Sequence, residues 1–229
     1  MLYESERKYL ATKISQLLSL GILNSEGGGF SLRLADGNIL ATPTGASFRL
    51  WQVNPEDFLI SDPEGKVLEK GKYLAVADFP VDLHIFSSFA LANSIVHLHA
   101  PYSLAFASLA KDIPPTTNLI STILPVPCLP SVDEDVLKKN YLANPYSVNI
   151  PDAVVKRPEV YIVFQRLIEK IDNQMLSRKD ELQKHGLAFT VEKHGLFVIA
   201  KNIDEAIENA IRVEAAARTA IYSKIISHG

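Results

Sequence analysis

The sequence has 229 residues, 47% hydrophobic and 21% charged, with a formal net charge of −3. This is ordinary globular composition, without the basic excess typical of nucleic-acid-binding surfaces. No apolar run approaches the ~20 residues that span a bilayer, and the acid-containing first ten residues have no apolar signal core. A single cysteine, Cys128, excludes an intrachain disulfide. We therefore expect a single-domain cytoplasmic protein without a nucleic-acid or membrane partner.

The chain is predicted to open with a helix followed by a β-hairpin. Residues 4–20 carry apolar side chains at helical spacing, and Gly21 is typical of a helix end. Residues 30–34 alternate apolar and polar side chains, as a half-buried strand does. The Asp-Gly pair within residues 35–38 predicts a tight turn into a return strand at 39–42. This order favours an antiparallel sheet with helices packed on it.

The rest of the chain alternates predicted helices with short predicted strands. Pro101 can open a helix because a proline in the first turn loses no helical hydrogen bond. Asn202 has the side-chain chemistry of an N-cap for the last helix. The predicted helices cover residues 82–92, 101–109, 158–184 and 203–226; predicted extended segments lie at 94–100, at 125–130 and in two runs within 187–200; and residues 140–157 read as a loop.

Two histidines stand one residue apart in the stretch "NSIVHLHAPYS". In a strand, residues i and i+2 project to the same side, so His97 and His99 can reach one cation. Neutral imidazole suits zinc and other divalent first-row ions. An isolated pair is more often two core histidines bonded to backbone carbonyls, since short metal motifs match by chance. A catalytic zinc site also needs a third protein ligand.

The candidates for a third ligand are His194 and His84. His194 precedes Gly195 at a predicted strand–strand junction, where glycine permits a sharp turn and a close approach. His84 lies among apolar residues of a predicted helix, which favours a core or supporting role. His185 lies at a helix end, and His228 lies in the C-terminal tail.

Three segments in order carry a family resemblance. "GGFSLRL" with "LATPTG", "NSIVHLHAPYSLAFASLAKDIPP" and "EKHGLFVIAKNIDEAI" together resemble the class II aldolase/adducin family, over roughly residues 5–139 and 181–226. The resemblance implies a three-layer α/β/α domain with a largely antiparallel central sheet. It also implies Zn²⁺ or another divalent transition metal on His97, His99 and His194, and a homotetramer with active sites at subunit interfaces.

The implied chemistry is that of a metal-dependent lyase. In such aldolases the ion chelates the carbonyl and adjacent hydroxyl of a small substrate and stabilises the enediolate left when the C–C bond breaks. Dehydration, epimerisation and decarboxylation are close variants of the same chemistry. The competing hypothesis is a non-catalytic, adducin-like oligomerisation or binding module that retains a metal.

The proton-transferring carboxylate departs from the family pattern, which has Ser-Ser-Glu or Ser-Ser-Asp upstream of the second helix. The acid usually precedes the helical histidine by four residues, and that position is Pro80. Counting nineteen residues back from His97 gives Asp78 instead, and Asp82 is a further possibility. We favour Asp78 as acid/base, although an aspartate before a helix is more often a cap. Tyr222 on the last helix is a hypothetical proton donor across subunits.

The residues expected to hold a phosphate are also altered. The family's Ser-Ser pair is replaced by residues that do not supply two hydroxyls, and Gly29 stands where an asparagine is usual. Thr44 with the Gly45 amide remains as an anion-binding hypothesis, and a plain turn is an equal alternative. Arg33 and Arg49 are candidate helpers, or surface residues. The sequence leaves open whether the substrate is a sugar phosphate, a carboxylate or an uncharged carbonyl compound.

Residues 140–180 have no counterpart in compact members of the family. Their predicted loop and helix form an insertion that we expect near the metal of the same or a neighbouring subunit, as a lid or a subunit contact.

Overall fold

An eight-stranded sheet forms the middle layer of the molecule. The computed structural model describes residues 1–73, 76, 78–131 and 158–228. The strand order is β4-β3-β2-β1-β5-β8-β7-β6, and all neighbouring pairs are antiparallel except β6 and β7. The strands are β1 Gly28–Arg33, β2 Ile39–Ala41, β3 Leu59–Ser61, β4 Val67–Glu69, β5 Ser94–Leu98, β6 Cys128–Leu129, β7 Leu187–Val191 and β8 Gly195–Ala200.

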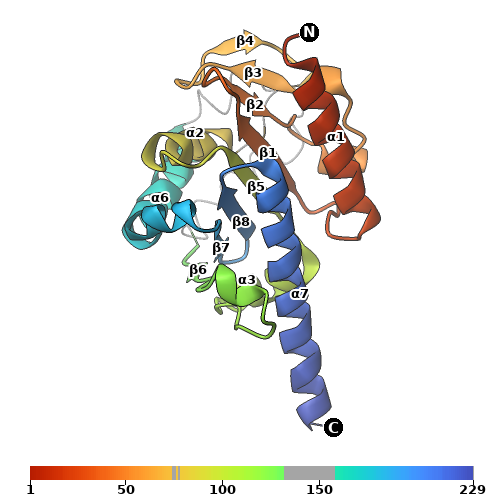
Figure 1. Cartoon of the computed structure of the whole chain (residues 1–229), viewed down its shortest axis with the longest axis vertical. Helices are drawn as coiled ribbons and strands as arrows, with labels where there is room; N and C mark the ends of the chain where they lie inside the picture. Colours follow the sequence, from red (N-terminus) through yellow and green to blue (C-terminus); the bar gives the residue numbers. More distant parts are fainter. Residues whose placement is uncertain (74–75, 77, 132–157, 229) are drawn as a thin grey trace.

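Helices cover both faces of this sheet (Figure 1). Successive residues of β5 point to opposite faces, so that Val96 joins the core under α1, α3 and α7, while Ile95 joins the core under α2 and α6. The predicted three-layer α/β/α domain with a largely antiparallel sheet is therefore confirmed. The helices are α1 Glu4–Ser19, α2 Phe79–Ser88, α3 Pro101–Ser108, α6 Pro158–Met175 and α7 Ile203–His228.

Most predicted elements form, with two corrections at helix boundaries. The helix predicted at 82–92 is α2, which starts earlier because Pro80 is tolerated in its first turn, and ends at Ser88, just before the buried Phe89. The helix predicted from Pro158 to residue 184 is α-helical only to Met175 and continues as the 3-10 helix Leu176–Gln183. Such tighter turns are common at helix ends.

The predicted N-cap of the last helix is confirmed, because Asn202 Oδ1 accepts a hydrogen bond from the Glu205 backbone N–H at 2.9 Å.

The predicted loop at 140–157 lies outside the described residues. The described part of the insertion, α6, is fastened to α2, where His84 Nε2 lies 2.8 Å from Asp172 Oδ1. Among the helices that the structure describes, none combines the length and apolar character needed to cross a bilayer.

A buried arginine ties α1 to the outer strands. The Arg7 side chain is fully buried; its Nε donates to Leu2 O at 2.7 Å and its Nη1 donates to Phe58 O at 2.8 Å and Pro55 O at 3.0 Å. Its Nη2 lies 3.2 Å from a carboxylate oxygen of Glu69. The charge is therefore surrounded by acceptors from three separate segments.

Arg7→Met is expected to lower the free energy of unfolding by about 3–5 kcal/mol, because it leaves three backbone carbonyls without their donor and Glu69 without its ion-pair partner. Urea denaturation measures the change. Lys8→Met is the matched control, since Lys8 is exposed and pairs only with Glu4 on its own helix, and it should cost less than about 0.5 kcal/mol. Equal midpoints for the two variants would show that Arg7 does not tie these segments together.

Candidate metal centre

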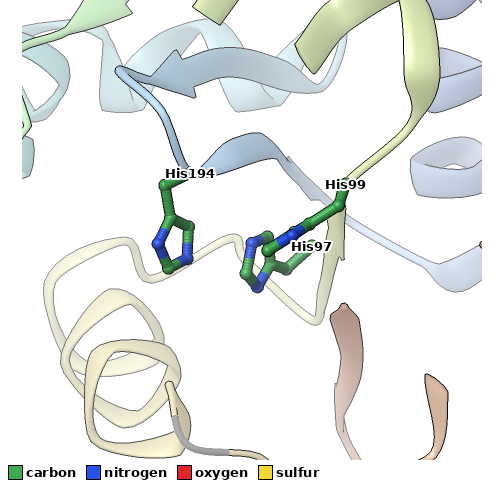
Figure 2. A group of neighbouring side chains, drawn as sticks. All are labelled: His97, His99 and His194. Carbon is green, nitrogen blue, oxygen red and sulfur yellow. The ribbon is translucent and has the colours of Figure 1, made fainter. Parts of the chain in front are cut away.

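Three histidines from two parts of the chain point toward one another (Figure 2). His97 lies on β5, His99 lies just beyond the end of β5, and His194 lies in the turn between β7 and β8. One ring nitrogen from each lies within 4.8 Å of the others. The sheet creates this meeting, because β5 and β8 are neighbours and run antiparallel. The end of β5 therefore lies beside the turn that carries His194.

The imidazole rings are closely packed in place. The His97 ring stacks on Phe197 at a centroid distance of 4.1 Å and on His194 at 4.8 Å. The His99 ring fits between two glycines: a Cβ at Gly27 or at Gly195 would come within 2.9 Å of it. Any other residue at these two positions would displace the ring, so the glycine behind His194 has the close-approach role that the sequence predicts.

Two of the three histidines, His97 and His99, are kept from taking up a proton, as metal binding requires. The pKa of His99 is lowered to about 2, chiefly by burial, with the neighbouring His97 and His194 contributing in the same direction. Burial also lowers the pKa of His97, although Asp78 opposes the shift. The Nε2 atoms of His97 and His194 are buried without a hydrogen-bond partner. Converging imidazoles with unpaired buried nitrogens fit a divalent transition ion.

Asp78 lies beside this cluster. It occupies the N-cap position of α2, yet its side chain makes no capping hydrogen bond. Its Oδ2 instead lies 2.9 Å from His97 Nδ1 and 3.6 Å from His194 Nε2. Burial by itself would raise the pKa of Asp78, but the adjacent His97 and His194 outweigh it and hold that pKa well below its usual range. Asp78 therefore occupies the position of a helix cap, but its side chain does not act as one.

Asp82, one helical turn after Asp78, has a different environment. Its side chain is buried, Oδ2 accepts a hydrogen bond from Ser31 Oγ at 2.6 Å, and Oδ1 has no partner. Burial raises the pKa of Asp82 well above its usual range, and the negative charge of Asp78 adds to the shift although the Ser31 bond opposes it. The two acids thus divide into an ionised carboxylate facing the histidines and a neutral acid packed against β1.

Asp82→Asn is expected to stabilise the metal-free chain at neutral and alkaline pH. Because the pKa of Asp82 is raised on folding, the folded state holds more protons than the unfolded state above about pH 4. Stability is therefore lost as the pH rises, and an uncharged isostere avoids this loss. Urea denaturation at pH 4 to 8 measures the difference in stability between the variant and the unaltered chain. The midpoint of the variant should exceed that of the unaltered chain by an amount that grows with pH and vanishes near pH 4. An equal advantage at every pH would contradict a buried neutral acid.

Comparison with known proteins identifies the family. The family model described as "Class II Aldolase and Adducin N-terminal domain" matches residues 9–221. The chain belongs to the class II aldolase and adducin family. Its resemblance at the three sequence segments is thus confirmed over nearly the whole chain.

Its relatives in this family include two named enzymes and a solved structure. The L-ribulose-5-phosphate 4-epimerase UlaF of Salmonella paratyphi A is 24% identical over 84% of this chain and 73% of the relative. The 5-deoxy-D-ribulose 1-phosphate aldolase of Bacillus thuringiensis is 28% identical over 57% of this chain and 61% of the relative. The crystal structure of YgbL from Escherichia coli, titled a putative aldolase/epimerase/decarboxylase, shares the fold with a TM-score of 0.69, at 22% identity over 95% and 89% of the two chains.

The residues predicted to hold a phosphate in this class II aldolase-type chain differ in what their side chains or backbone contact. Arg49 covers the Thr44–Gly45 turn: its Nη2 donates to Thr44 O at 3.0 Å, and its guanidinium lies 3.7 Å from the ring centre of Tyr73. Arg33 instead binds backbone carbonyls near the end of α2. A Cβ at Gly29 would lie 2.8 Å from the Val76 side chain, so this position is packed rather than open.

The other candidate residues lie outside the histidine cluster. Tyr222 is half exposed on α7, with its hydroxyl 3.4 Å from that of Tyr102. His84 pairs with Asp172, and His185 Nδ1 contacts Gly186 O. Neither is among the clustered side chains, and the structure therefore favours His194 as the third member.

Two residues near the cluster were missed from the sequence. Asn24 Nδ2 donates to the His99 carbonyl at 2.8 Å, and its own carbonyl accepts from Trp51 Nε1 at 2.7 Å. The edge of the Trp51 ring also lies 3.3 Å from a Cβ built on Gly28. These contacts link the loop after Gly45 to the backbone of His99. They join segments far apart in sequence, so no local motif marks them.

Proposed function

We propose that the chain is a metal-dependent lyase of the class II aldolase type, which cleaves, dehydrates, epimerises or decarboxylates a small hydroxy-carbonyl compound. The observation that carries this proposal is the convergence of three histidines, with unpaired buried nitrogens, beside the ionised Asp78. Family membership supplies the reaction class. The single half-buried Cys128 suits work in the cytoplasm.

His97, His99 and His194 would hold the divalent ion, for which zinc is our first choice. Such an ion supplies Lewis-acid stabilisation of negative charge on substrate oxygens. An imidazole ligand brings no negative charge, so three of them would leave the positive charge of the ion undiminished for that purpose. Phe197 closes one side of the His97 ring and keeps water from it.

Asp78 is our candidate for proton transfer. Its Oδ2 is directed at the cluster rather than at the helix N-terminus, so it would lie beside a substrate held there. An ionised carboxylate can accept a proton from a substrate hydroxyl or carbon and return it later in the cycle. Asp82 does not suit this role, because it is neutral and engaged with Ser31.

We propose a sugar phosphate as the substrate, with its phosphate on the Thr44–Gly45 turn. The names of the ribulose-phosphate epimerase and deoxyribulose-phosphate aldolase relatives support this class. Arg49 adds a positive charge directly over the turn, which can compensate for the serine pair that is missing upstream of the second helix. The Arg33 guanidinium binds backbone carbonyls near the end of α2, so it is not part of this phosphate site. A contact between the phosphate and Gly29 stays a prediction.

A homotetramer with sites at subunit interfaces is part of the same proposal. The C-terminal part of α7 projects beyond the body of the molecule (Figure 1) and exposes Tyr222, Ile225 and Ile226. Apolar side chains grouped on one exposed helix end are typical of subunit contacts. Tyr222 would then reach a neighbouring active site as a proton donor.

Metal analysis of the purified full-length chain tests the proposal first. We expect about one equivalent of divalent metal per chain, since three-histidine sites hold zinc well. The metal-loaded protein is then assayed with ketose and aldose phosphates and with their unphosphorylated analogues. Less than about a tenth of an equivalent, with no uptake on zinc titration, would favour an adducin-like binding module. Turnover of only the unphosphorylated compounds would support the proposed lyase activity and contradict the proposed phosphate site.

A further inference from the structure

Glu214 on α7 reaches across to the first turn of α3. Its side chain is buried, its Oε1 accepts from the Tyr102 backbone N–H at 2.7 Å, and its Oε2 accepts from the Ser103 N–H at 2.8 Å. Both oxygens are thus used on two successive N–H groups of one helix start. An acidic side chain is also favoured at this end of a helix, where the helix dipole is positive.

The sequence around α3 provides no cap of its own. Its N-cap residue is Ala100, which has no side-chain donor or acceptor, and Pro101 has no N–H. The first free N–H groups of the helix are therefore those of Tyr102 and Ser103, and in a buried position they need a partner. Glu214 supplies it from 112 and 111 residues further along the chain.

This capped turn is directly connected to His99. Only Ala100 and Pro101 separate His99 from the two N–H groups, and Ala100 is fully buried. On the other side, Asn24 holds the His99 carbonyl at 2.8 Å. The backbone that carries the imidazole is thus fixed both at the residue itself and immediately after it.

The His99 ring has little room for displacement. The ring fits between Gly27 and Gly195 only because glycine lacks a Cβ. A Cβ at either position would lie 2.9 Å from the nearest carbon of the ring. A movement of the α3 start by a few tenths of an ångström would move the ring against this backbone or away from the other two histidines. Metal affinity depends steeply on such geometry, because outer contacts that orient a ligand are typically worth ~10–100-fold.

We propose that Glu214 is a positioning residue for His99: through the first turn of α3 it fixes the position from which this imidazole reaches the metal. The inference rests on the metal site of the proposed function. A role limited to fastening α7 to α3 would change stability and leave metal affinity unchanged, and the two roles are therefore separable.

The test is a zinc titration of the metal-free full-length chain, in competition with a chelator of known affinity. Glu214→Gln keeps the size but sets an amide donor against one of the two N–H groups, and we expect zinc affinity to fall about tenfold or more. Glu208→Gln is the matched control, because Glu208 lies on the same helix, is exposed and pairs with Arg212. The zinc affinity of this variant should stay within about twofold of that of the unaltered chain. Arg7→Met controls for lost stability, and it should bind zinc as the unaltered chain does.

Each outcome of the titration is decisive. Zinc affinity in Glu214→Gln equal to that of the unaltered chain would overturn the positioning role and leave the proposed function in place. Absence of zinc binding by the unaltered chain would overturn both. If Glu214→Gln is insoluble, Glu214→Asp replaces it: this variant keeps the charge but is one methylene too short to reach both N–H groups. It should lose affinity to a smaller extent, and full affinity would again reject the proposal.

Discussion

Replacing His194 by alanine is expected to reduce bound divalent metal from about one equivalent per chain to less than about a tenth. The variant removes one of three converging imidazoles, and His97 and His99 alone leave a two-coordinate site that solvent and chelators can compete for. Alanine at His97 or at His99 should have the same effect. Metal content after gel filtration and zinc affinity by competition both measure the loss.

The matched controls are His84→Ala and His185→Ala, which remove imidazoles that the structure places with Asp172 and Gly186. Both should retain the full equivalent of metal. Retention in His194→Ala together with loss in His84→Ala would mean that His84 is the third ligand. Thermal unfolding gives a second readout, since a ligand at 1,000 times its dissociation constant stabilises the folded state by about 4 kcal/mol. Chelator should therefore lower the melting temperature of the unaltered chain and leave that of His194→Ala unchanged.

Asp78→Asn is expected to reduce kcat by about 10²–10⁴ while the metal stays bound. Asparagine keeps the shape of the side chain beside His97 and His194 but cannot accept a proton in the reaction. The loss should appear in kcat rather than in KM, because the proton moves only in the chemical step. Steady-state kinetics on the substrate found by screening, with metal content measured on the same samples, provide the data.

Asp82→Asn is the control for Asp78→Asn, because it makes the same chemical change one helical turn further along α2. It should retain kcat within a few-fold, as expected for a residue that only packs against β1 through Ser31. A large loss in Asp82→Asn with a small loss in Asp78→Asn would reverse the assignment. Loss of metal from Asp78→Asn would indicate that this carboxylate belongs to the metal site itself.

The predictable parts of this protein are those that local patterns determine. The side-by-side projection of His97 and His99 follows from strand geometry, and the hairpin follows from an Asp-Gly turn. The predicted helix at 82–92 begins too late, because α2 includes Pro80 in its first turn, where a proline loses no helical hydrogen bond. The direction of the Asp78 side chain could not be predicted, since it depends on where β5 and β8 place their histidines.

The contacts that hold the site in place are long-range and leave little trace in sequence. Asn24 and Glu214 act on backbone groups 75 and more than 110 residues away. The one signal for Glu214 is its place among alanines and valine in "IRVEAAAR", where an acid on a buried helix face needs a partner. Sequence indicates that such a partner exists but does not identify it.

The link from Asn24 to Trp51 gives the molecule a built-in optical probe. Trp51 is the single tryptophan of the chain, it is 3% exposed, and its indole N–H is bonded to the residue that also holds the His99 carbonyl. All tryptophan emission therefore originates from one place, two hydrogen bonds from a proposed ligand. Tryptophan fluorescence thus reports on the surroundings of the proposed ligand His99 without any label.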